Sequence, residues 1–256
     1  MTEHIKTTTQ DGVLEIIFAR PDKKNALSNA MYRAAADALE NAQTDDSVRV
    51  VLMSSEGDAF TAGNDLADFA GAATGKGEEL QAGRFIRVLA QAEKPLIAAV
   101  PGLAIGVGTT MLLHCDLVFI ADSAKLSTPF VNLALVPEAA STLLLTARIG
   151  HARAFALFAM GEALSGAEAS NLGIANRVLP KDEVIPAARA AARALAAKPL
   201  GAVIATKRLM RESEAILTRM AREGPVFAER LKTAEAREAF SAFAERRPPD
   251  FTRLAS

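Results

Sequence analysis

The sequence predicts an α/β fold in which helices cover both faces of the strands, followed by a helical C-terminal region. Short runs rich in valine, isoleucine and leucine alternate with helical stretches early in the chain, which is typical of strands joined by crossover helices. After about residue 139 the strand signals nearly stop, and long Ala/Arg/Glu-rich helices are expected from about 181 to 246. A chain of 256 residues with 50% hydrophobic content can bury one sizeable core.

The predicted elements follow in order along the chain. Strand-forming runs bounded by turn residues occupy 12–20, 47–54, 95–102, 115–122 and, as the last short one, 176–180. Helical spacing of apolar residues marks 28–43, with Ser28 as the expected N-cap, and 78–93. Ser165 and Glu168 form a capping-box pattern for a short helix that Gly173 would end. We therefore expect a core over residues 1–198 and a C-terminal helical region over 199–256.

Composition argues against several functional classes. The net charge is −1, with 29 basic and 30 acidic residues, so neither nucleic acid nor an anionic membrane is an expected partner. The single cysteine excludes a disulfide framework and a cysteine-rich zinc site, and the three histidines are scattered without metal-ligand spacing. The polar N-terminus, with no apolar window of roughly 20 residues anywhere, favours a soluble, cytoplasmic protein.

His114 and Cys115 are adjacent, which at first suggests a nucleophile beside its base. Neighbouring residues on a helix point about 100° apart, so their side chains do not face each other. A free cysteine is also usually buried. We expect both residues to belong to the core or to an interface.

Two glycine-containing loops are candidates for a binding or catalytic site. In "GDAFTAGNDLADF" (57–69), Gly63 permits an unusual backbone conformation, the amides from Asn64 onward could point into a pocket, and Asp65 could tie down the loop. An ordinary Asx-type turn is the alternative. In "VPGLAIGVGTTMLLHCD" (100–116), Val107 lies between Gly106 and Gly108 at the entry to an apolar helix. Such an entry exposes amides that suit an anion or a developing oxyanion, although close helix–strand packing would also explain the glycines.

Glu138 is the one carboxylate in the apolar stretch "TPFVNLALVPEAAS" (128–141). Because it follows Pro137, it is expected in the first turn of a helix. Apolar neighbours would raise its pKa and the helix N-terminus would lower it. From the residues alone, the favoured interpretation is an acid that stabilises the helix dipole.

Several ordered motifs together resemble the crotonase superfamily, the enoyl-CoA hydratase/isomerase family. They are "ARPDKKNALSNAMY" (19–32), "AFTAGNDLADF" (59–69), "GLAIGVGTTMLLHCDLVFIAD" (102–122) and "LSGAEASNLGIANRVLP" (164–180). The resemblance implies a crotonase-like spiral of repeated ββα units with a C-terminal helical region. It also implies an acyl-CoA thioester substrate, no separate cofactor because CoA arrives with the substrate, and a homotrimer or dimer of trimers.

The resemblance also implies roles for particular residues. The amides of Asn64 and Val107 match the pair that binds the thioester oxygen, in loops that include Gly106 and Gly108. The segments that contact CoA are 23–26 and 62–66, which supply Lys23, Lys24, Ala26, Ala62, Gly63, Asp65 and Leu66. Basic residues near the C-terminus, such as Lys232, Arg246 or Arg247, could also meet the phosphates. The stretch 227–251 could cover the acyl pocket or pack on a neighbouring subunit.

The side chains in the acyl pocket separate the two main activities of the family. Hydratases resemble one another in two glutamates that hold the attacking water, and these positions are Thr110 and Phe130 here. The stretch around Glu138 is similar to the peroxisomal-type 3,2-enoyl-CoA isomerases, in which a glutamate so placed is the catalytic base. The expected activity is therefore 3-enoyl-CoA to 2-enoyl-CoA isomerisation in fatty-acid breakdown.

Three alternatives stay open. The first is an enoyl-CoA hydratase with Glu138 as its sole carboxylate. The second is another CoA-thioester reaction that uses Asp65 or Asp68, since one fold supports many reactions. The third is a non-catalytic CoA-binding subunit.

Overall fold

A mixed sheet forms the centre of the computed structural model, which describes residues 2–66 and 80–253. Among these residues its strands follow the order β1-β2-β3-β5-β7-β10. The β1–β2 pair is antiparallel, and every other neighbouring pair is parallel. The bounds are β1 Ile5–Gln10, β2 Val13–Phe18, β3 Val50–Ser55, β5 Leu96–Val100, β7 Leu117–Ala121 and β10 Arg177–Leu179.

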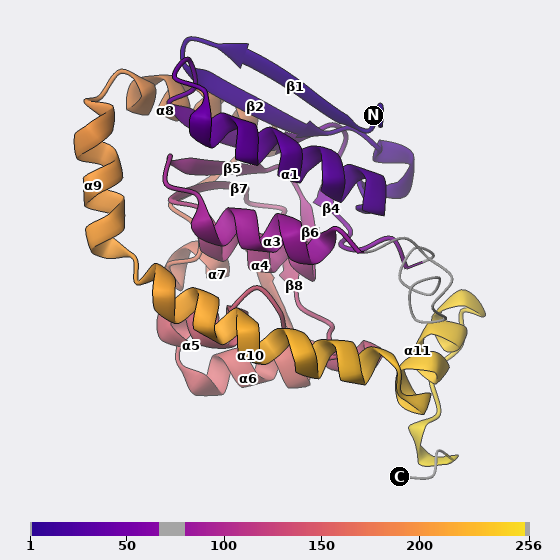
Figure 1. Cartoon of the computed structure of the whole chain (residues 1–256). Helices are drawn as coiled ribbons and strands as arrows, with labels where there is room; N and C mark the ends of the chain where they lie inside the picture. The colour runs from indigo at the N-terminus through magenta and orange to yellow at the C-terminus, as the bar shows by residue number, and fades with distance from the viewer. Residues whose placement is uncertain (1, 67–79, 254–256) are drawn as a thin grey trace.

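Helices bury the middle of this sheet. β3 and β5 are buried along their whole length, which their continuous apolar sequences favour. α8 (Lys181–Ala196) packs against β3, β5 and β7. α1 (Asn29–Thr44) and α3 (Ala82–Gln91) lie side by side in front of the sheet in Figure 1.

A second, smaller sheet gives the chain its repeating pattern. It consists, within the described residues, of β4 Ala59–Thr61, β6 Leu103–Ile105, β8 Lys125–Ser127 and β9 Ala163–Ser165, in that order. The chain passes from β3 to β4, from β5 to β6 and from β7 to β8, with helical sequence following each pair of strands. This succession confirms the predicted spiral of ββα units.

The short helices lie between these strands. They are η1 Pro21–Lys23, α4 Val107–Thr110, η2 Met111–His114, η3 Val131–Leu133, α5 Ser141–Ile149, α6 His151–Ala159 and α7 Gly166–Asn171. The C-terminal helices are α9 Leu200–Met210, α10 Ser213–Leu231 and α11 Ala234–Ala244, followed by η4 Phe251–Arg253. α10 packs against α3 and α5 and runs below α3 in Figure 1, and α11 packs against η3.

Local signals predicted the longer apolar strands and several helices correctly. All five expected strands are present, the Ser28 side chain accepts from the Met31 amide, and Ser165 and Glu168 form the capping box. The sequence analysis missed β1, β4, β6, β8 and β9. β1 is an exposed edge strand with polar residues, and the others are three residues long, so neither kind leaves an apolar pattern. The start of the expected 78–93 helix, at 78–79, lies outside the described residues.

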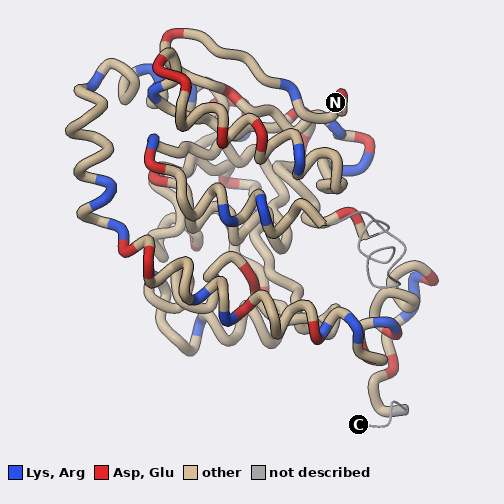
Figure 2. Tube along the Cα trace, in the orientation of Figure 1, with Lys and Arg blue, Asp and Glu red and all other residues tan. Residues whose placement is uncertain are grey.

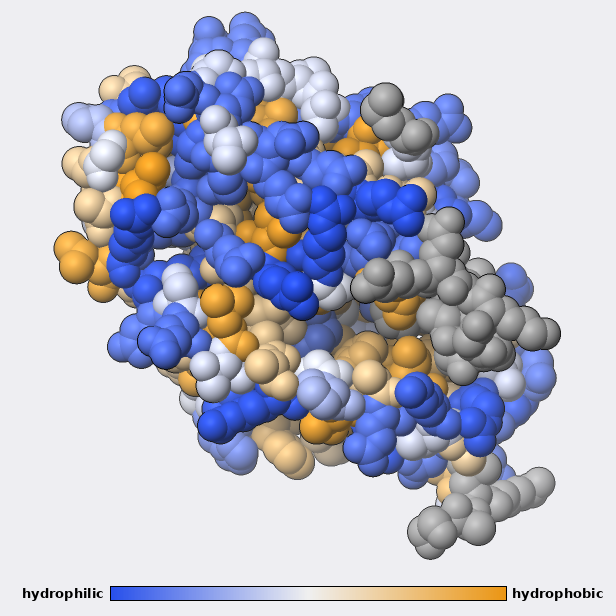
Figure 3. Space-filling model, in the orientation of Figure 1, coloured by the Kyte–Doolittle hydropathy of each residue, from blue (hydrophilic) through white to orange (hydrophobic). Residues whose placement is uncertain are grey.

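Charged residues of both signs are spread along the described chain. Lys and Arg alternate with Asp and Glu along the chain in Figure 2, in keeping with the net charge of −1. Hydrophilic and hydrophobic residues are likewise mixed on the face shown in Figure 3. No helix in the described part of the chain is both long and apolar enough to cross a membrane.

Candidate active site

The loop after β4 takes a shape that only glycine allows at position 63. Gly63 has φ +88°, and a Cβ there would lie 2.8 Å from the Ile105 carbonyl oxygen. The Leu27 amide donates to the Gly63 carbonyl (2.8 Å), and the Asp65 amide donates to the Leu27 carbonyl (3.0 Å). The Asn64 amide between them donates to no other described residue. The loop therefore presents a backbone donor, as the glycine pattern predicted.

The loop after β6 presents a second backbone donor. Gly106 has φ 56° and ψ −117°, a conformation open only to glycine, and α4 starts at the next residue. The amides of Gly106 and Thr109 are used within the fold, whereas that of Val107 donates to no residue in the described ranges. The predicted helix entry is correct, although the α-helical part spans only Val107–Thr110.

The two loops pack directly on each other. A Cβ at Gly108 would lie 2.6 Å from Cγ2 of Thr61, the last residue of β4. With the contact between Gly63 and Ile105, this second close approach leaves no space for larger residues. Close packing therefore explains these glycines, and it brings the two loops into contact.

Tyr32 of α1 links the first loop to Glu138. Its hydroxyl donates to Oδ1 of Asn64, and its ring packs on Phe85 with 5.5 Å between centroids. Burial raises the pKa of Tyr32 well above its ordinary value, and the nearby charge of Glu138 raises it further. The sequence analysis gave this residue no role, although it is the chain's single tyrosine and lies within a family motif.

Glu138 has a buried carboxylate in which only one of the two oxygens accepts a hydrogen bond from a described residue. Thr110 Oγ1 donates to Oε1 (2.6 Å), while Oε2 is buried and has no hydrogen-bond partner among the described residues. The residue as a whole is partly exposed, so the shielding is local to the carboxylate. Burial raises its pKa to about 7, against the lowering effect of the Thr110 hydroxyl, and the charge of Glu223 adds to the rise. Such a carboxylate is suited to accept a proton near neutral pH.

The expected position of Glu138 in a helix is wrong. α5 begins at Ser141, and Glu138 lies in the turn before it. Ala139 (φ 61°) and Ala140 (φ 54°) adopt left-handed conformations, which interrupt any helix starting at Pro137. A role in the first turn of a helix is therefore excluded, and burial decides the direction of the pKa shift.

A cavity of about 800 Å³ adjoins the two loops. Of the expected site residues, it is lined by Lys23, Ala26, Ala62, Gly63, Asn64, Asp65, Leu66, Gly106 and Phe130. Lys24, Val107, Gly108, Thr110 and Glu138 are outside this lining. Thr110 and Val107 are both buried. The Thr110 hydroxyl donates to the Glu138 carboxylate. The Glu138 carboxyl group is thus held beside α4, close to the second loop, although it is not part of this cavity's wall.

Two further cations and three further aromatic residues also line the cavity. With Lys23, the cations are Arg20 and Arg247. The aromatic residues are Phe227, Phe240 and Phe243, from α10 and α11. Arg20 is ion-paired with Asp65 (2.7 Å), and Arg247 with Glu238. Of the expected C-terminal cations, Arg247 lines the cavity, whereas Lys232 and Arg246 do not.

The segment that carries Lys23 is held in place by a buried asparagine that the sequence analysis passed over. Asn25, with φ 55°, donates through Nδ2 to the carbonyls of Glu56 (2.9 Å) and Ala59 (2.8 Å). Its Oδ1 accepts from the Arg20 amide (2.7 Å). The signal that could have found it is its place in the first family motif, directly after Lys24.

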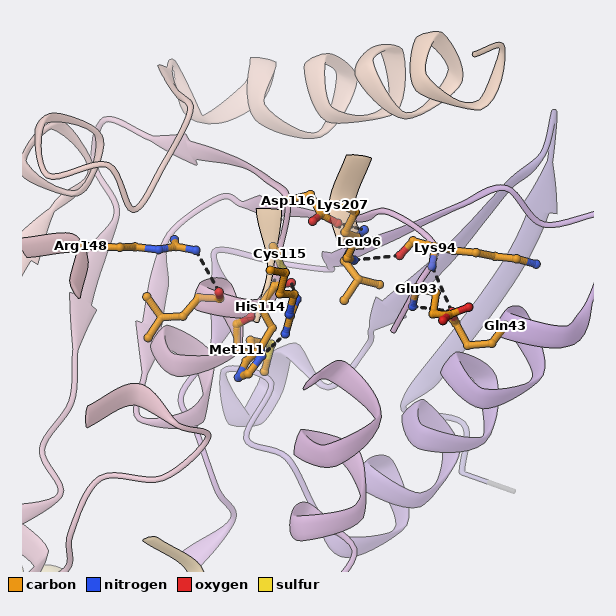
Figure 4. A network of polar contacts seen from close by, with 12 residues as sticks. Gln43, Glu93, Lys94, Leu96, Met111, His114, Cys115, Asp116, Arg148 and Lys207 are labelled. Carbon is orange, nitrogen blue, oxygen red and sulfur yellow. Dashed lines mark hydrogen bonds and ion pairs between the residues drawn. The ribbon is translucent and has the colours of Figure 1, made fainter. Parts of the chain in front are cut away.

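His114 and Cys115 are buried, as expected, and belong to an internal polar network (Figure 4). His114 Nε2 donates to the Ala139 carbonyl (2.8 Å), so its Nδ1 accepts from Arg211 (2.7 Å). Burial and the charge of Arg211 lower the pKa of His114 to about 3. Burial raises the pKa of Cys115 to about 12, so it carries no thiolate near neutral pH.

No cluster of three or more His, Cys, Asp or Glu residues in the described ranges has the arrangement of a metal site. Asp65 contacts Arg20, and Asp68, the other acid considered for a different thioester reaction, lies outside the described residues.

The chain is similar to known proteins over nearly its whole length. The family model described as enoyl-CoA hydratase/isomerase matches residues 8–253. The 1,2-epoxyphenylacetyl-CoA isomerase of Escherichia coli (strain K12) is 33% identical over 98% of this chain and 99% of that protein. Enoyl-CoA delta isomerase 2 of Rattus norvegicus is 33% identical over 82% of this chain, which spans 55% of that longer protein. An enoyl-CoA hydratase/isomerase structure from Pseudoalteromonas atlantica T6c has a TM-score of 0.92, with 40% identity over 98% of this chain and 100% of that chain.

Proposed function

Because this chain belongs to the enoyl-CoA hydratase/isomerase family, we propose that it moves the double bond of a 3-enoyl-CoA to position 2. The observation that carries the proposal is the buried, unpartnered Oε2 of Glu138 on a carboxylate whose pKa is raised to about 7. A base that titrates near the working pH can both take and return a proton.

Glu138 would transfer the proton between two carbons of the substrate. Its carboxylate takes a proton from C2, and the electron pair delocalises over the C3–C4 double bond and the thioester, giving a dienolate. The protonated Glu138 then returns a proton to C4, leaving the double bond between C2 and C3. No other reactant is consumed, and a positioned base of this kind contributes on the order of 10²–10⁴ in rate.

The dienolate places negative charge on the thioester oxygen. The amides of Asn64 and Val107, which have no acceptor among the described residues, are the proposed donors to that oxygen. Each such donor typically contributes about 2.7–4 kcal/mol to transition-state stabilisation. Their contribution is therefore comparable to that of the base.

Hydration is less well supported because it requires carboxylates to activate water. Thr110 and Phe130 stand where the family's hydratases carry glutamates, and Thr110 instead donates to Glu138. Glu223, the carboxylate whose charge acts on Glu138, accepts from Ala140 and Thr142 through its two oxygens. It is not free to hold water.

Turnover of a 3-enoyl-CoA and of a 2-enoyl-CoA, each by the wild type and by Glu138→Gln, tests the proposal. We expect isomerisation of the first to fall at least about 100-fold in the variant, with little hydration of the second by either protein. Glu229→Gln, which alters an exposed residue of α10, is the matched control. Efficient hydration of the 2-enoyl-CoA by the wild type would instead establish a hydratase.

Substrate binding is proposed to use the cavity of about 800 Å³, with its cations facing the CoA phosphates and its aromatic residues facing apolar parts of the substrate. α9 supports the proposed trimer or dimer of trimers, because Leu209 is 90% and Met210 82% exposed. Apolar side chains so exposed favour a subunit contact. Light scattering of the wild type and Leu209→Asp would show whether α9 is part of that contact.

A further inference from the structure

Glu223 is a buried acid that the proposed reaction does not use. It lies on α10, is 8% exposed and does not line the substrate cavity. Oε2 accepts from the Ala140 amide (2.7 Å), and Oε1 accepts from the amide (3.1 Å) and the hydroxyl of Thr142. An acceptor with three donors is a well-satisfied ionised carboxylate, so Glu223 fastens α10 to the turn that follows Glu138.

The same turn is held from the opposite side by His114. Its Nε2 donates to the Ala139 carbonyl, while Glu223 accepts from the Ala140 amide. This carbonyl and this amide belong to one peptide group, which two buried side chains therefore hold at both polar ends. Glu138 is the residue directly before that peptide group.

The turn needs such support because its conformation is unfavourable. Ala139 and Ala140 are both in the left-handed region, which alanine rarely occupies. A freed turn would relax toward ordinary backbone angles and shift the Glu138 side chain. A misplacement of about 1 Å can cost on the order of 10²-fold in rate.

We propose that Glu223 is a positioning residue that, together with His114, holds the Ala139–Ala140 peptide group and thereby aims Glu138 at the substrate. This inference rests on the proposed function of Glu138 as the base.

The charged and titratable groups around the turn come from several elements. The charge of Glu223 on α10 raises the pKa of Glu138, and the charge of Glu138 raises the pKa of Tyr32 on α1. Arg219 of α10 donates to the Thr142 hydroxyl and lowers the pKa of Glu223, whose burial raises it. His114 faces the cations Arg148, Lys207 and Arg211, and with its pKa lowered to about 3 it stays neutral in the assay range. Removal of the Glu223 charge should therefore lower the pKa of Glu138.

The test compares Glu223→Ala and Glu223→Gln with Glu229→Gln, an exposed glutamate on the same helix. With a 3-enoyl-CoA, Glu223→Ala should lower kcat about 10–100-fold while KM changes less than about twofold, because Glu223 is outside the cavity lining. In Glu223→Gln the acidic limb of the pH profile of kcat/KM should move to lower pH. A purely structural role would reduce the amount of folded protein without moving that limb.

Backbone hydrogen exchange gives a readout that does not depend on the reaction. The amides of Ala140 and Thr142 should exchange faster in Glu223→Ala and remain unchanged in Glu229→Gln. An active wild type whose Glu223 variants match the control in kcat, or keep the wild-type acidic limb, would overturn the inference. If the wild type does not convert a 3-enoyl-CoA, the proposed function is refuted instead. If the exchange of the two amides is unchanged in Glu223→Ala, Glu223 does not hold the turn.

Discussion

Replacing Glu138 with glutamine should stabilise the protein at neutral and alkaline pH, in addition to removing the proposed base. The folded state raises the pKa of Glu138 from its ordinary value of 4.5 to about 7, mainly through burial. At 1.36 kcal/mol per pH unit, this pKa difference corresponds to about 3 kcal/mol of unfolding free energy. Glutamine has the same shape, keeps an acceptor for Thr110 and avoids the buried charge.

The sign of the pH dependence follows from proton binding. Between pH 4.5 and about 7 the folded state holds more protons at Glu138 than the unfolded state does, so the wild type loses stability as pH rises through this window. The variant lacks this titration. Its advantage over the wild type should therefore grow by about 2–3 kcal/mol between pH 5 and pH 8.

Urea unfolding of both proteins at pH 5 and pH 8 measures this difference. The protein concentration is held fixed, because subunit association would change the apparent stability. Glu229→Gln should show no comparable change, since its glutamate is exposed. A stability difference between the wild type and Glu138→Gln that stays constant with pH, or a variant less stable than the wild type at pH 8, would refute the reasoning.

Three further predictions concern kinetics. The kcat/KM for a 3-enoyl-CoA should fall about tenfold per pH unit below about pH 7, as protonation removes the Glu138 base, and a rate that stays flat to pH 5 would contradict this. Tyr32→Phe should lower kcat about two- to tenfold in steady-state assays, because Asn64 loses a hydrogen bond of about 0.5–1.5 kcal/mol. Lys23→Ala should raise KM about two- to fivefold, with the effect decreasing at high salt, whereas Lys24→Ala, outside the cavity lining, should change KM less.

Features governed by neighbouring residues could be predicted from the sequence. Ser28 and Ser165 cap their helices as expected, because capping depends on groups two or three positions away. Buried strands such as β3 and β5 were found through their apolar runs. Gly63 was identified because glycine permits a backbone conformation that other residues avoid.

The strands of the second sheet could not be predicted from the sequence because they are too short. Strands as short as β4 and β8 contain too few residues to establish an alternating pattern. They form because long-range pairing supplies the hydrogen bonds that three residues alone do not secure. β1 was missed because it is polar and exposed along nearly its whole length.

By itself the sequence determined the kind of fold, the two glycine loops and the presence of one carboxylate in an apolar stretch, because these are local properties. Only the tertiary structure decided the direction in which the pKa of that carboxylate shifts. The charge of Glu223, 85 positions further along the chain, raises the pKa of Glu138, and the side chain of Thr110 lowers it. Burial and a helix terminus push a pKa in opposite directions, and their balance depends on how closely distant segments surround the carboxyl group.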